Sequence, residues 1–373
     1  MRLLHIVSHP IQYQAPLFRR IAAESGVDLR VLFTRDTENG YFDRGFSRDV
    51  QWDIPLRGGY DSVLWRQTEW RREIANCDAV WVHGWQGAKI LRAIARAHAL
   101  GKPVLMRAEN TDDAMPDGYA LRGVVKRRFL KWVFDRCALF LSIGRANRDY
   151  YLRRGISIER IFPMPYAVDN DFFGERAHAA RPHRAELRRS LELDDRPIIL
   201  FAGKLIERKH PEQLMRAWAD ASWTGKKPVL LYVGDGEMKR VLENNAPADV
   251  RFLGFRNQTE MPALYDLADV FVLPAEREPW GLAVNESMAC GTAAVVSDRV
   301  GCAPDLVDSS CGAVVPLGDD GALGRALIDV LGRAEPAGQA AARKIADWSF
   351  AADVHGLRRA LDSLTAGSAT SLP

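Results

Sequence analysis

The residues that most clearly suggest a chemical role are two glutamates, Glu278 and Glu286. Seven residues separate them in the string AEREPWGLAVNE, which follows the apolar run DVFVLP (269–274). This run is typical of a buried strand, so Glu278 falls in a strand-to-helix turn and Glu286 about two turns into the helix. The free amides and positive dipole end of a helix N-terminus suit a phosphate. The pair therefore predicts a diphosphate at Gly281 and Leu282, with a sugar near Glu278 and a nucleoside near Glu286.

A second candidate group follows PIILFAG (197–203), which also predicts a strand. Gly203 ends this run, and Lys204 and Lys209 follow it, five residues apart, before another helical pattern. Two cations at a strand end would neutralise a diphosphate and stabilise it as a leaving group in glycosyl or phosphoryl transfer. The alternatives are plainer. The lysines could lie in an exposed loop, and the two glutamates could be ordinary residues of a helix N-terminus and a solvated helix face.

Short runs rich in Val, Ile and Leu alternate with helical periodicity along the chain, as expected of βαβ units around buried parallel sheets. Further predicted strands are 3–8, 27–33, 79–82, 104–107, 138–143, 228–234, 250–254 and 292–297. The alternation lapses at about 168–195, which is polar, charge-dense and carries Pro182. This segment is the predicted inter-domain connection.

The sequence thus predicts an α/β chain with two doubly wound, Rossmann-like domains, 1–170 and 171–348. A final helix within 349–373 could pack back on the first domain. Ligands of such sheets bind at the carboxyl ends of the strands, so we expect the function to lie in a cleft that the two domains face.

Length and composition exclude several classes of protein. With 373 residues, 47% hydrophobic and 27% charged, the chain has the composition of a globular protein and the length of about two domains. No uninterrupted apolar stretch approaches the ~20 residues of a membrane span, and the short apolar start before His9 is unlike a signal sequence. The five cysteines form no C-x-x-C pair, which suits thiols in a reducing compartment. We therefore expect a cytoplasmic protein.

With these motifs the sequence resembles the retaining, nucleotide-sugar-dependent glycosyltransferases of the GT-B fold, in particular the GT4 (glycosyl transferases group 1) family. The resemblance is strongest over residues 197–320. In the first half it is weaker and rests on HPIQYQAPLFRRI and on the VDNDFF that follows IFPMPY. It implies that Glu278 contacts the donor sugar, that Glu286 contacts the ribose hydroxyls, and that the backbone at Trp280, Gly281 and Leu282 contacts the diphosphate.

The family's G-[RK]-L-x-x-x-K turn maps onto Gly203, Lys204 and Lys209, which implies that these residues also contact the diphosphate. Lysine at 204 replaces the commoner arginine, so the charge is kept and the bidentate fork is lost. The string GDGE (234–237) resembles another turn of the family that lies near the nucleotide, although a tight turn that starts a helix explains it equally well. Arg256-Asn257 would border the base.

The first domain departs from the family pattern. Many relatives carry a Gly-Gly turn after the first strand, where this chain has SHPIQY, and some carry a histidine after the fourth strand, where this chain has MRAEN. We expect Glu109 or Arg107 to be the catalytic partner in this domain, with His83 as the rival. His9 and Gln12, in the first strand-end turn, are further acceptor-side candidates. Each of these residues could instead be structural.

The segment 122–136 is rich in cations interleaved with apolar residues. This pattern is typical of an amphipathic helix that lies on an anionic membrane surface. The alternative is a domain helix that packs its apolar face on the sheet. No recognised nucleic-acid motif accompanies the basic residues, so we expect no nucleic-acid partner.

The resemblance implies a glycosyltransferase that moves a hexose from a nucleotide diphosphate sugar to a hydroxyl acceptor, glycan or lipid-linked, with retention and without an obligatory metal. Cell-surface polysaccharide or glycolipid synthesis would be its setting, and it could be peripheral at the inner face of the membrane. Two alternatives are a sugar-nucleotide epimerase of the same architecture and a non-catalytic bilobed solute-binding protein. The glutamate pair argues against the epimerase. Two carboxylates and two lysines at strand ends are more than binding alone needs.

Overall fold

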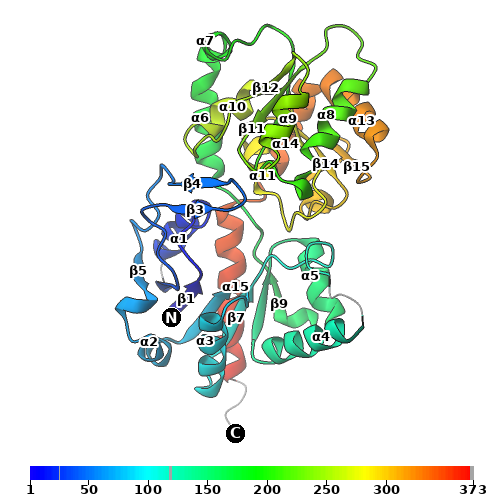
Figure 1. The fold of residues 1–373 in the computed structure, drawn as a ribbon. Coiled ribbons are helices and arrows are strands. Elements are labelled where there is room, and N and C mark those ends of the chain that lie inside the picture. The colour runs from blue at the N-terminus through cyan, green and yellow to red at the C-terminus, as the bar shows by residue number, and fades with distance from the viewer. Residues whose placement is uncertain (25, 117–119, 370–373) are drawn as a thin grey trace. The chain divides into compact units, whose positions relative to one another are not determined.

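The computed structural model describes residues 1–24, 26–116 and 120–369, and it has an α/β fold with two parallel sheets (Figure 1). The chain divides into two compact units. Unit 1 comprises Met1–Asn39, Pro55–Tyr166 and Phe350–Pro373, and unit 2 comprises Gly40–Ile54 and Ala167–Ser349. The predicted α/β class with two doubly wound, Rossmann-like sheets is confirmed.

The sheet of unit 1 has the strand order β5-β2-β1-β6-β7-β8-β9, with all neighbours parallel. In that order the strands are Asp61–Leu64, Asp28–Phe33, Arg2–Val7, Ala79–His83, Val104–Arg107, Leu139–Ser142 and Ile161–Pro163. The helices are α1 (Ala15–Ala22), α2 (Trp70–Asn76), α3 (Ala88–Ala99), α4 (Ala120–Phe134), α5 (Arg145–Arg153) and α15 (Phe350–Ala369). One apolar core includes residues of α3 and α4, and a second includes residues of α1 and α15. The strands are therefore buried on both faces, which explains their nearly continuous apolar runs.

Helix α15, drawn in red in Figure 1, closes unit 1 from the far end of the sequence. It packs against α1, β8 and β9 and buries Leu357 and Leu361. Gly356 permits this approach, because a Cβ there would lie 1.8 Å from the carbonyl oxygen of Pro163. Residues 370–373 of the predicted C-terminal segment lie outside the described residues.

The sheet of unit 2 has the order β12-β11-β10-β13-β14-β15, again with parallel neighbours. In that order the strands are Val250–Phe252, Val229–Val233, Ile198–Ala202, Val270–Leu273, Ala293–Ser297 and Gly312–Val315. The helices are α6 (Asn170–Ala180), α7 (Arg184–Ser190), α8 (Pro211–Asp220), α9 (Lys239–Asn245), α10 (Met261–Leu267), α11 (Leu282–Ala289), α12 (Ala303–Leu306), α13 (Asp320–Gly332) and α14 (Ala334–Ile345). This is the 3-2-1-4-5-6 strand order of a nucleotide-binding sheet.

The assignment of all of 1–170 to the first domain needs a correction. Residues Gly40–Ile54 belong to unit 2, where they form the antiparallel hairpin of β3 (Tyr41–Asp43) and β4 (Arg48–Val50). The hairpin is short and polar, so its sequence resembles a surface loop. Its place is set by side-chain contacts with loops more than 150 residues away, such as the hydrogen bond from Asn257 to Gln51.

The predicted connection at 168–195 also differs from the structure. The boundary between the units follows Tyr166, and most of the polar segment is helical, in α6 and α7. Asp169 caps α6 by accepting a hydrogen bond from the amide of Phe172, and Phe173 and Ala177 are buried. The polar composition of 168–195 suggested a linker because α6 buries only a few of its side chains.

Candidate functional site

The predicted donor residues of unit 2 lie at the point where the strand order reverses. Strands β10 and β13 are neighbours, and the chain leaves β10 toward β11 and leaves β13 toward β14 on the opposite side. Crevices outside the carboxyl ends of such strands hold the ligands of doubly wound sheets. Gly203 and Lys204 follow β10, and Glu278 and Gly281 follow β13. Both predicted groups therefore come together at one sheet edge.

Backbone hydrogen bonds tie the strand-end loops of unit 2 to one another. The amide of Leu205 donates to the Asp235 carbonyl at 2.9 Å, and the amide of Glu276 donates to the Arg208 carbonyl at 2.9 Å. Gly234 is required by close packing, because a Cβ there would lie 1.8 Å from the Gly203 carbonyl oxygen. The GDGE turn is thus a packing element that holds the lysine loop in place.

The turn before α11 is fixed in the same way. The amide of Gly301 donates to the Glu278 carbonyl at 2.9 Å, and a Cβ at Gly301 would lie 1.9 Å from the Pro279 carbonyl oxygen. Gly281 has a φ of 103° and is the N-cap of α11, a backbone conformation that favours glycine. Helix α11 therefore begins four residues after Glu278, at Leu282, and no side chain of the described residues caps its N-terminus.

Lys209 and Glu278 form a direct ion pair, and their side chains are only 14% and 15% exposed. Burial, followed by the charges of Arg208 and Lys204, lowers the pKa of Lys209, whereas the Glu278 carboxylate favours its charged form. A bound anion would offset the repulsion between the neighbouring cations. The arrangement can therefore bind a diphosphate and place a carboxylate beside it.

Glu286 lies in α11 and accepts a hydrogen bond from the hydroxyl of Tyr265 at 2.7 Å. Burial raises the pKa of Glu286 to about 7, although the Tyr265 hydrogen bond acts in the opposite direction. The carboxylate is thus oriented by a buried partner on α10 and can accept hydrogen bonds from a diol in its ionised form.

The side chain of Trp280 is buried, and its Nε1 donates to Asn285 at 2.8 Å. Its ring lies 5.2 Å from that of Trp348. The prediction for Trp280 and Leu282 concerned their backbone, and the buried indole anchors that backbone at the start of α11.

In unit 1, four side chains meet at the carboxyl edge of the sheet. Glu109, after β7, accepts hydrogen bonds at Oε1 from Tyr166 and, at 3.4 Å, from Tyr13, and His83 Nε2 lies 3.5 Å from the same oxygen. Burial raises the pKa of Glu109, but His83, Tyr166 and Arg107 outweigh it, so the net pKa is below its usual value. Within the described residues, Oε2 accepts no hydrogen bond. The cluster presents an ionised carboxylate with one oxygen available to a ligand.

The other acceptor-side candidates have different surroundings. Arg107 is buried, and it donates to Asp353 of α15 at 2.7 Å and to the carbonyls of Met164 and Pro165. Its guanidinium therefore joins α15 to the sheet, and we do not propose Arg107 as a contact of the acceptor. The side chains of His9 and Ser8 form a hydrogen bond, with 2.8 Å between His9 Nδ1 and Ser8 Oγ. Gln12 shares the turn before α1, and both residues are partly exposed.

The sequence analysis missed Tyr13, Tyr166, Tyr265 and Asp43. Asp43, in the hairpin of residues 40–54, accepts hydrogen bonds from Lys204 at 2.9 and 3.0 Å. Tyr13 lies in SHPIQY, the turn after the first strand, and Tyr166 follows the run IFPMP. Their positions at strand ends could have indicated that they belong to the site. Nothing in the local sequence of Asp43 or Tyr265 points to a partner so far along the chain.

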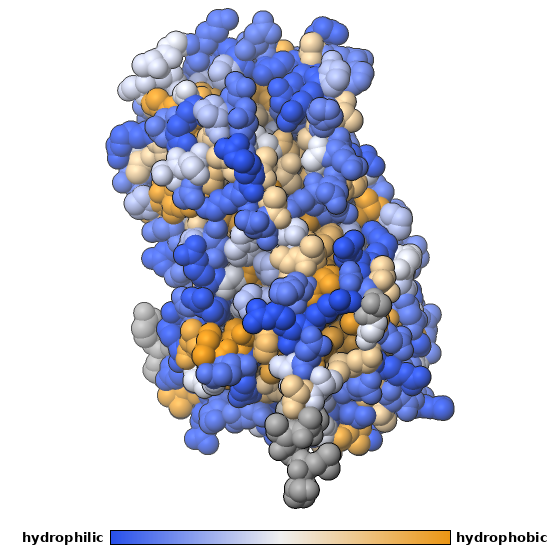
Figure 2. Space-filling model, turned by 180° about the vertical axis from the view of Figure 1, so that it is seen from behind, coloured by the Kyte–Doolittle hydropathy of each residue, from blue (hydrophilic) through white to orange (hydrophobic). Residues whose placement is uncertain are grey.

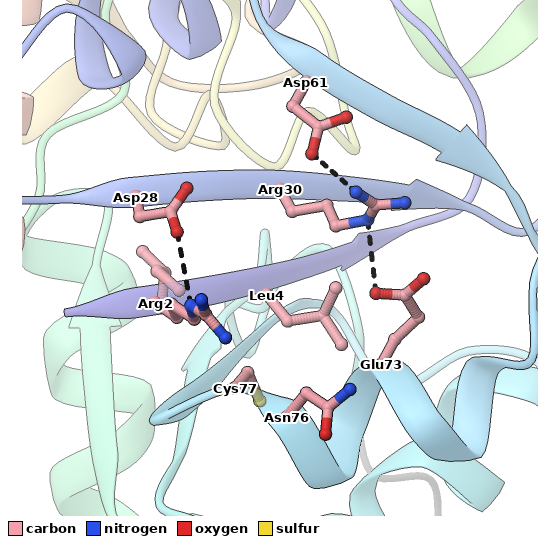
Figure 3. Close-up of a pocket in the computed structure, with 9 residues that line it drawn as sticks. Arg2, Leu4, Asp28, Arg30, Asp61, Glu73, Asn76 and Cys77 are labelled. Carbon is pink, nitrogen blue, oxygen red and sulfur yellow. Dashed lines mark hydrogen bonds and ion pairs between the residues drawn. The ribbon is translucent and has the colours of Figure 1, made fainter.

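A separate pocket of about 280 Å³ lies at the amino ends of β1, β2 and β5 (Figure 3). Its charged side chains pair with one another. Arg2 lies 3.6 Å from Asp28, and Arg30 lies 2.8 Å from Asp61 and 3.2 Å from Glu73. Each of these five charged side chains has a partner within the pocket, and the pocket lies at the amino ends of the strands, so we assign it no ligand.

The chain is similar to known glycosyltransferases in sequence and in fold. The family model described as Glycosyl transferases group 1 matches residues 183–344. An alpha-D-kanosaminyltransferase of Streptomyces kanamyceticus is 27% identical over 273 residues, which cover 68% of each chain. A GDP-mannose-dependent alpha-(1-6)-phosphatidylinositol monomannoside mannosyltransferase of Mycolicibacterium smegmatis is 32% identical over 242 residues, which cover 61% of each chain.

Solved structures share the fold at low sequence identity. Anabaena HepE in complex with UDP and glucose has a TM-score of 0.73 and 15% identity, with 97% of this chain and 100% of that chain covered. Sucrose-phosphate synthase from Thermosynechococcus elongatus has a TM-score of 0.69 and 18% identity, with 98% and 100% covered. Residues 183–344 thus match the glycosyl transferases group 1 family model, and the curated relatives and solved structures indicate a nucleotide-sugar-dependent glycosyltransferase of the GT-B fold.

Proposed function

We propose that this protein transfers a hexose from a nucleotide diphosphate sugar to a hydroxyl of a glycan or lipid-linked acceptor, with retention of the anomeric configuration. The observation that carries the proposal is the partly buried ion pair of Lys209 and Glu278 in the loops before α11, whose N-terminus no side chain of the described residues caps. The mannosyltransferase relative is named as GDP-mannose-dependent, and HepE was solved with UDP and glucose. Both names support a nucleotide-linked hexose as the donor.

In the proposed reaction the bond between the anomeric carbon and the diphosphate oxygen breaks, and its electron pair leaves with the diphosphate. The acceptor oxygen bonds to the anomeric carbon and releases its proton. Lys204 and Lys209 stabilise the departing charge, so we propose that no metal is obligatory. Glu278 orients the sugar, and Glu286 accepts hydrogen bonds from the ribose.

We assign acceptor recognition to the cluster around Glu109 in unit 1. Its Oε2 can accept a hydrogen bond from the acceptor hydroxyl, while Tyr13, Tyr166 and His83 hold Oε1. An ionised carboxylate at this place would lower the cost of proton release. His9 and Gln12 stay candidates for contacts with the rest of the acceptor.

The test is a panel of UDP-, GDP- and ADP-hexoses with free nucleoside diphosphate as the readout, in the presence of EDTA and with and without hydroxyl acceptors. We expect release with one donor, stimulated by an acceptor. Glu278→Ala should abolish turnover while the protein stays folded by circular dichroism, whereas Glu243→Ala, at an exposed glutamate of α9, should leave turnover unchanged. If no donor releases its nucleotide, or if Glu278→Ala retains near-normal turnover, the proposal is wrong.

We also propose that α4 contacts an anionic membrane surface at the cytoplasmic face. Val133 and Leu130 pack in the core of unit 1, as the domain-helix alternative requires. A second apolar stripe points outward, however, because Leu121, Val125 and Trp132 are 75%, 59% and 37% exposed. The exposed cations Arg122, Arg127, Arg128 and Lys131 accompany the stripe. Figure 2 shows apolar areas among hydrophilic residues on one face of the molecule.

No helix in the described part of the chain is long and apolar enough to span a bilayer. The membrane proposal is tested by co-sedimentation with vesicles of neutral phosphatidylcholine alone or with added phosphatidylglycerol. We expect binding only to the anionic vesicles, and its loss in Val125→Ser/Arg128→Ser. The control, Val241→Ser/Arg240→Ser, changes an exposed valine and an exposed arginine on α9. Equal sedimentation of both double variants would contradict the proposal.

A further inference from the structure

We propose that the hairpin of residues 40–54 is part of the donor site, and that Asp43 holds Lys204 in an ion pair which the donor diphosphate must replace. Asp43 would then lower the affinity for the nucleotide, because its carboxylate competes with the diphosphate for Lys204. This inference rests on the proposed function, because it takes Lys204 to be a diphosphate contact. It assigns a role to a segment that lies far from the donor residues in sequence.

The hairpin is anchored on the loop that follows β12. Asn257 donates to the Gln51 carbonyl at 2.7 Å, and the amide of Thr259 donates to Asp53 at 3.2 Å. The ring of Phe46 meets that of Phe255 edge to face at 5.2 Å. Hydrogen bonds and an aromatic contact thus fix the hairpin to the carboxyl edge of the unit 2 sheet.

The tip of the hairpin reaches the lysine loop. Both carboxylate oxygens of Asp43 accept hydrogen bonds from Lys204 Nζ, at 2.9 and 3.0 Å. The amides of Gly45 and Phe46 also donate to Asp43, at 2.8 and 3.2 Å. A Cβ at Gly45 would lie 2.5 Å from Cδ of Lys204, so the lysine stem is packed directly on the hairpin. Asp43 is therefore held in place independently of Lys204.

The charge of Asp43 opposes an incoming diphosphate. Burial raises the pKa of Asp43, but the hydrogen bonds and charge of Lys204 and the amides of Gly45 and Phe46 outweigh it, so the carboxyl is ionised at neutral pH. Its side chain is 12% exposed and that of Lys204 is 31% exposed, so solvent screens the pair only in part. A diphosphate that binds Lys204 must share or displace this carboxylate.

The hairpin also supplies one cation, Arg48, to the strand-end loops of unit 2. Arg48 lies 4.8 Å from the centre of the Phe255 ring and 4.0 Å from Asp235. Both partners belong to strand-end loops of unit 2, after β12 and β11. The hairpin therefore spans the strand ends from β10 to β12, where a nucleotide would extend from its diphosphate to its base.

The experiment measures binding of UDP, GDP, ADP and inorganic pyrophosphate by calorimetry to the full chain. Asp43→Asn keeps the side-chain shape and removes the charge, and Asp43→Ser provides a second neutral variant with a short acceptor. We expect both to bind pyrophosphate and the preferred nucleoside diphosphate about three- to tenfold more tightly, the size of a partly screened charge interaction. Asp49→Asn changes an exposed aspartate of the same hairpin and should bind as the wild type does.

A double-variant cycle separates competition from a general charge effect. In the Lys204→Ala background, Asp43→Asn should change the affinity less than twofold, because the cation for which the two anions compete is gone. Unchanged or weaker binding by both neutral variants, in a wild type that binds and turns over its donor, overturns this inference alone. If the wild type neither binds the nucleotides nor releases them from any donor, the proposed function falls and the inference falls with it.

Discussion

The carboxyl edges of the two units are built in different ways. In unit 2 the strand-end loops are joined by backbone hydrogen bonds and by glycines that no other residue could replace, such as Gly234 and Gly301. In unit 1 side chains from separate loops converge on Glu109. A backbone frame suits a ligand part common to all donors, the diphosphate, whereas a side-chain cluster can change with the acceptor.

The units also differ in how their edges are supported. Unit 1 depends on the buried ion pair of Arg107 and Asp353, whose side chains are 1% and 0% exposed, and this pair joins strand β7 to α15. At its carboxyl edge unit 2 has the ion pair of Lys209 and Glu278, whose side chains are 14% and 15% exposed, and Trp280 packs against Trp348. Removal of one charge at these edges should therefore cost more stability in unit 1, where the ion pair is fully buried, than in unit 2, where it is partly exposed.

The largest expected effect is on stability. Asp353→Ala should lower the free energy of unfolding by about 3–5 kcal/mol, because it leaves the buried Arg107 charge without its partner. Urea denaturation measures this loss. The control Asp362→Ala, at an exposed position of α15, should be near neutral, and Arg107→Met/Asp353→Leu should recover most of the stability. A small loss in Asp353→Ala would show that the ion pair does not support unit 1.

The next effect is on chemistry in unit 2. Lys209→Ala should lower kcat/KM by about 100- to 1000-fold, the scale of one lost electrostatic contact in the transition state. Steady-state kinetics with the preferred donor measures it. Lys226→Ala, at an exposed lysine of the same unit, should retain full activity. If both variants were equally active, the frame of unit 2 would not be the donor site.

A smaller effect is expected in unit 1. Glu109→Gln should lower kcat/KM for the acceptor by about 10- to 100-fold, because the amide is a weaker proton acceptor than the carboxylate. Slow donor hydrolysis and nucleoside diphosphate binding should not change. A loss in the acceptor-dependent rate without a change in donor hydrolysis or nucleotide binding tests the proposal that unit 1 recognises the acceptor and unit 2 the donor. A parallel loss of nucleotide binding would contradict it.

The smallest effect concerns pH. Glu286 has a pKa raised to about 7 by burial, and its ionised form is the proposed acceptor of hydrogen bonds from the ribose hydroxyls. Nucleoside diphosphate affinity should therefore fall as the pH drops from 8 to 6. Tyr265→Phe removes a hydrogen bond that stabilises the carboxylate, so the pKa should rise further and the profile should move to higher pH.

At pH 7 the affinity of Tyr265→Phe should be about two- to tenfold lower, the net value of one hydrogen bond. Titration of the nucleotide phosphates is common to both proteins and cancels in the comparison. A profile that coincides with the wild type would show that Tyr265 does not position Glu286.

Much of the fold could be predicted because both sheets are buried on two faces. Central strands such as β1 and β10 are then continuous apolar runs, which the sequence analysis places to within a few residues. The strands that were not predicted, β3, β4, β5 and β15, are three or four residues long, and β5 and β15 lie at sheet edges. Their apolar runs are too short to be distinguished from loops in the sequence. Only backbone pairing with a neighbouring strand defines them.

The sequence by itself determined the donor constellation, because glycines, lysines and glutamates at fixed offsets from strand ends reach a common edge whenever the strands are parallel. Only the tertiary structure decided the partners of these residues. The ion pair of Asp43 with Lys204, the hydrogen bond of Tyr265 to Glu286 and the docking of α15 through Arg107 join positions from 21 to 246 residues apart. No local pattern encodes such contacts, because their geometry depends on how the layers pack.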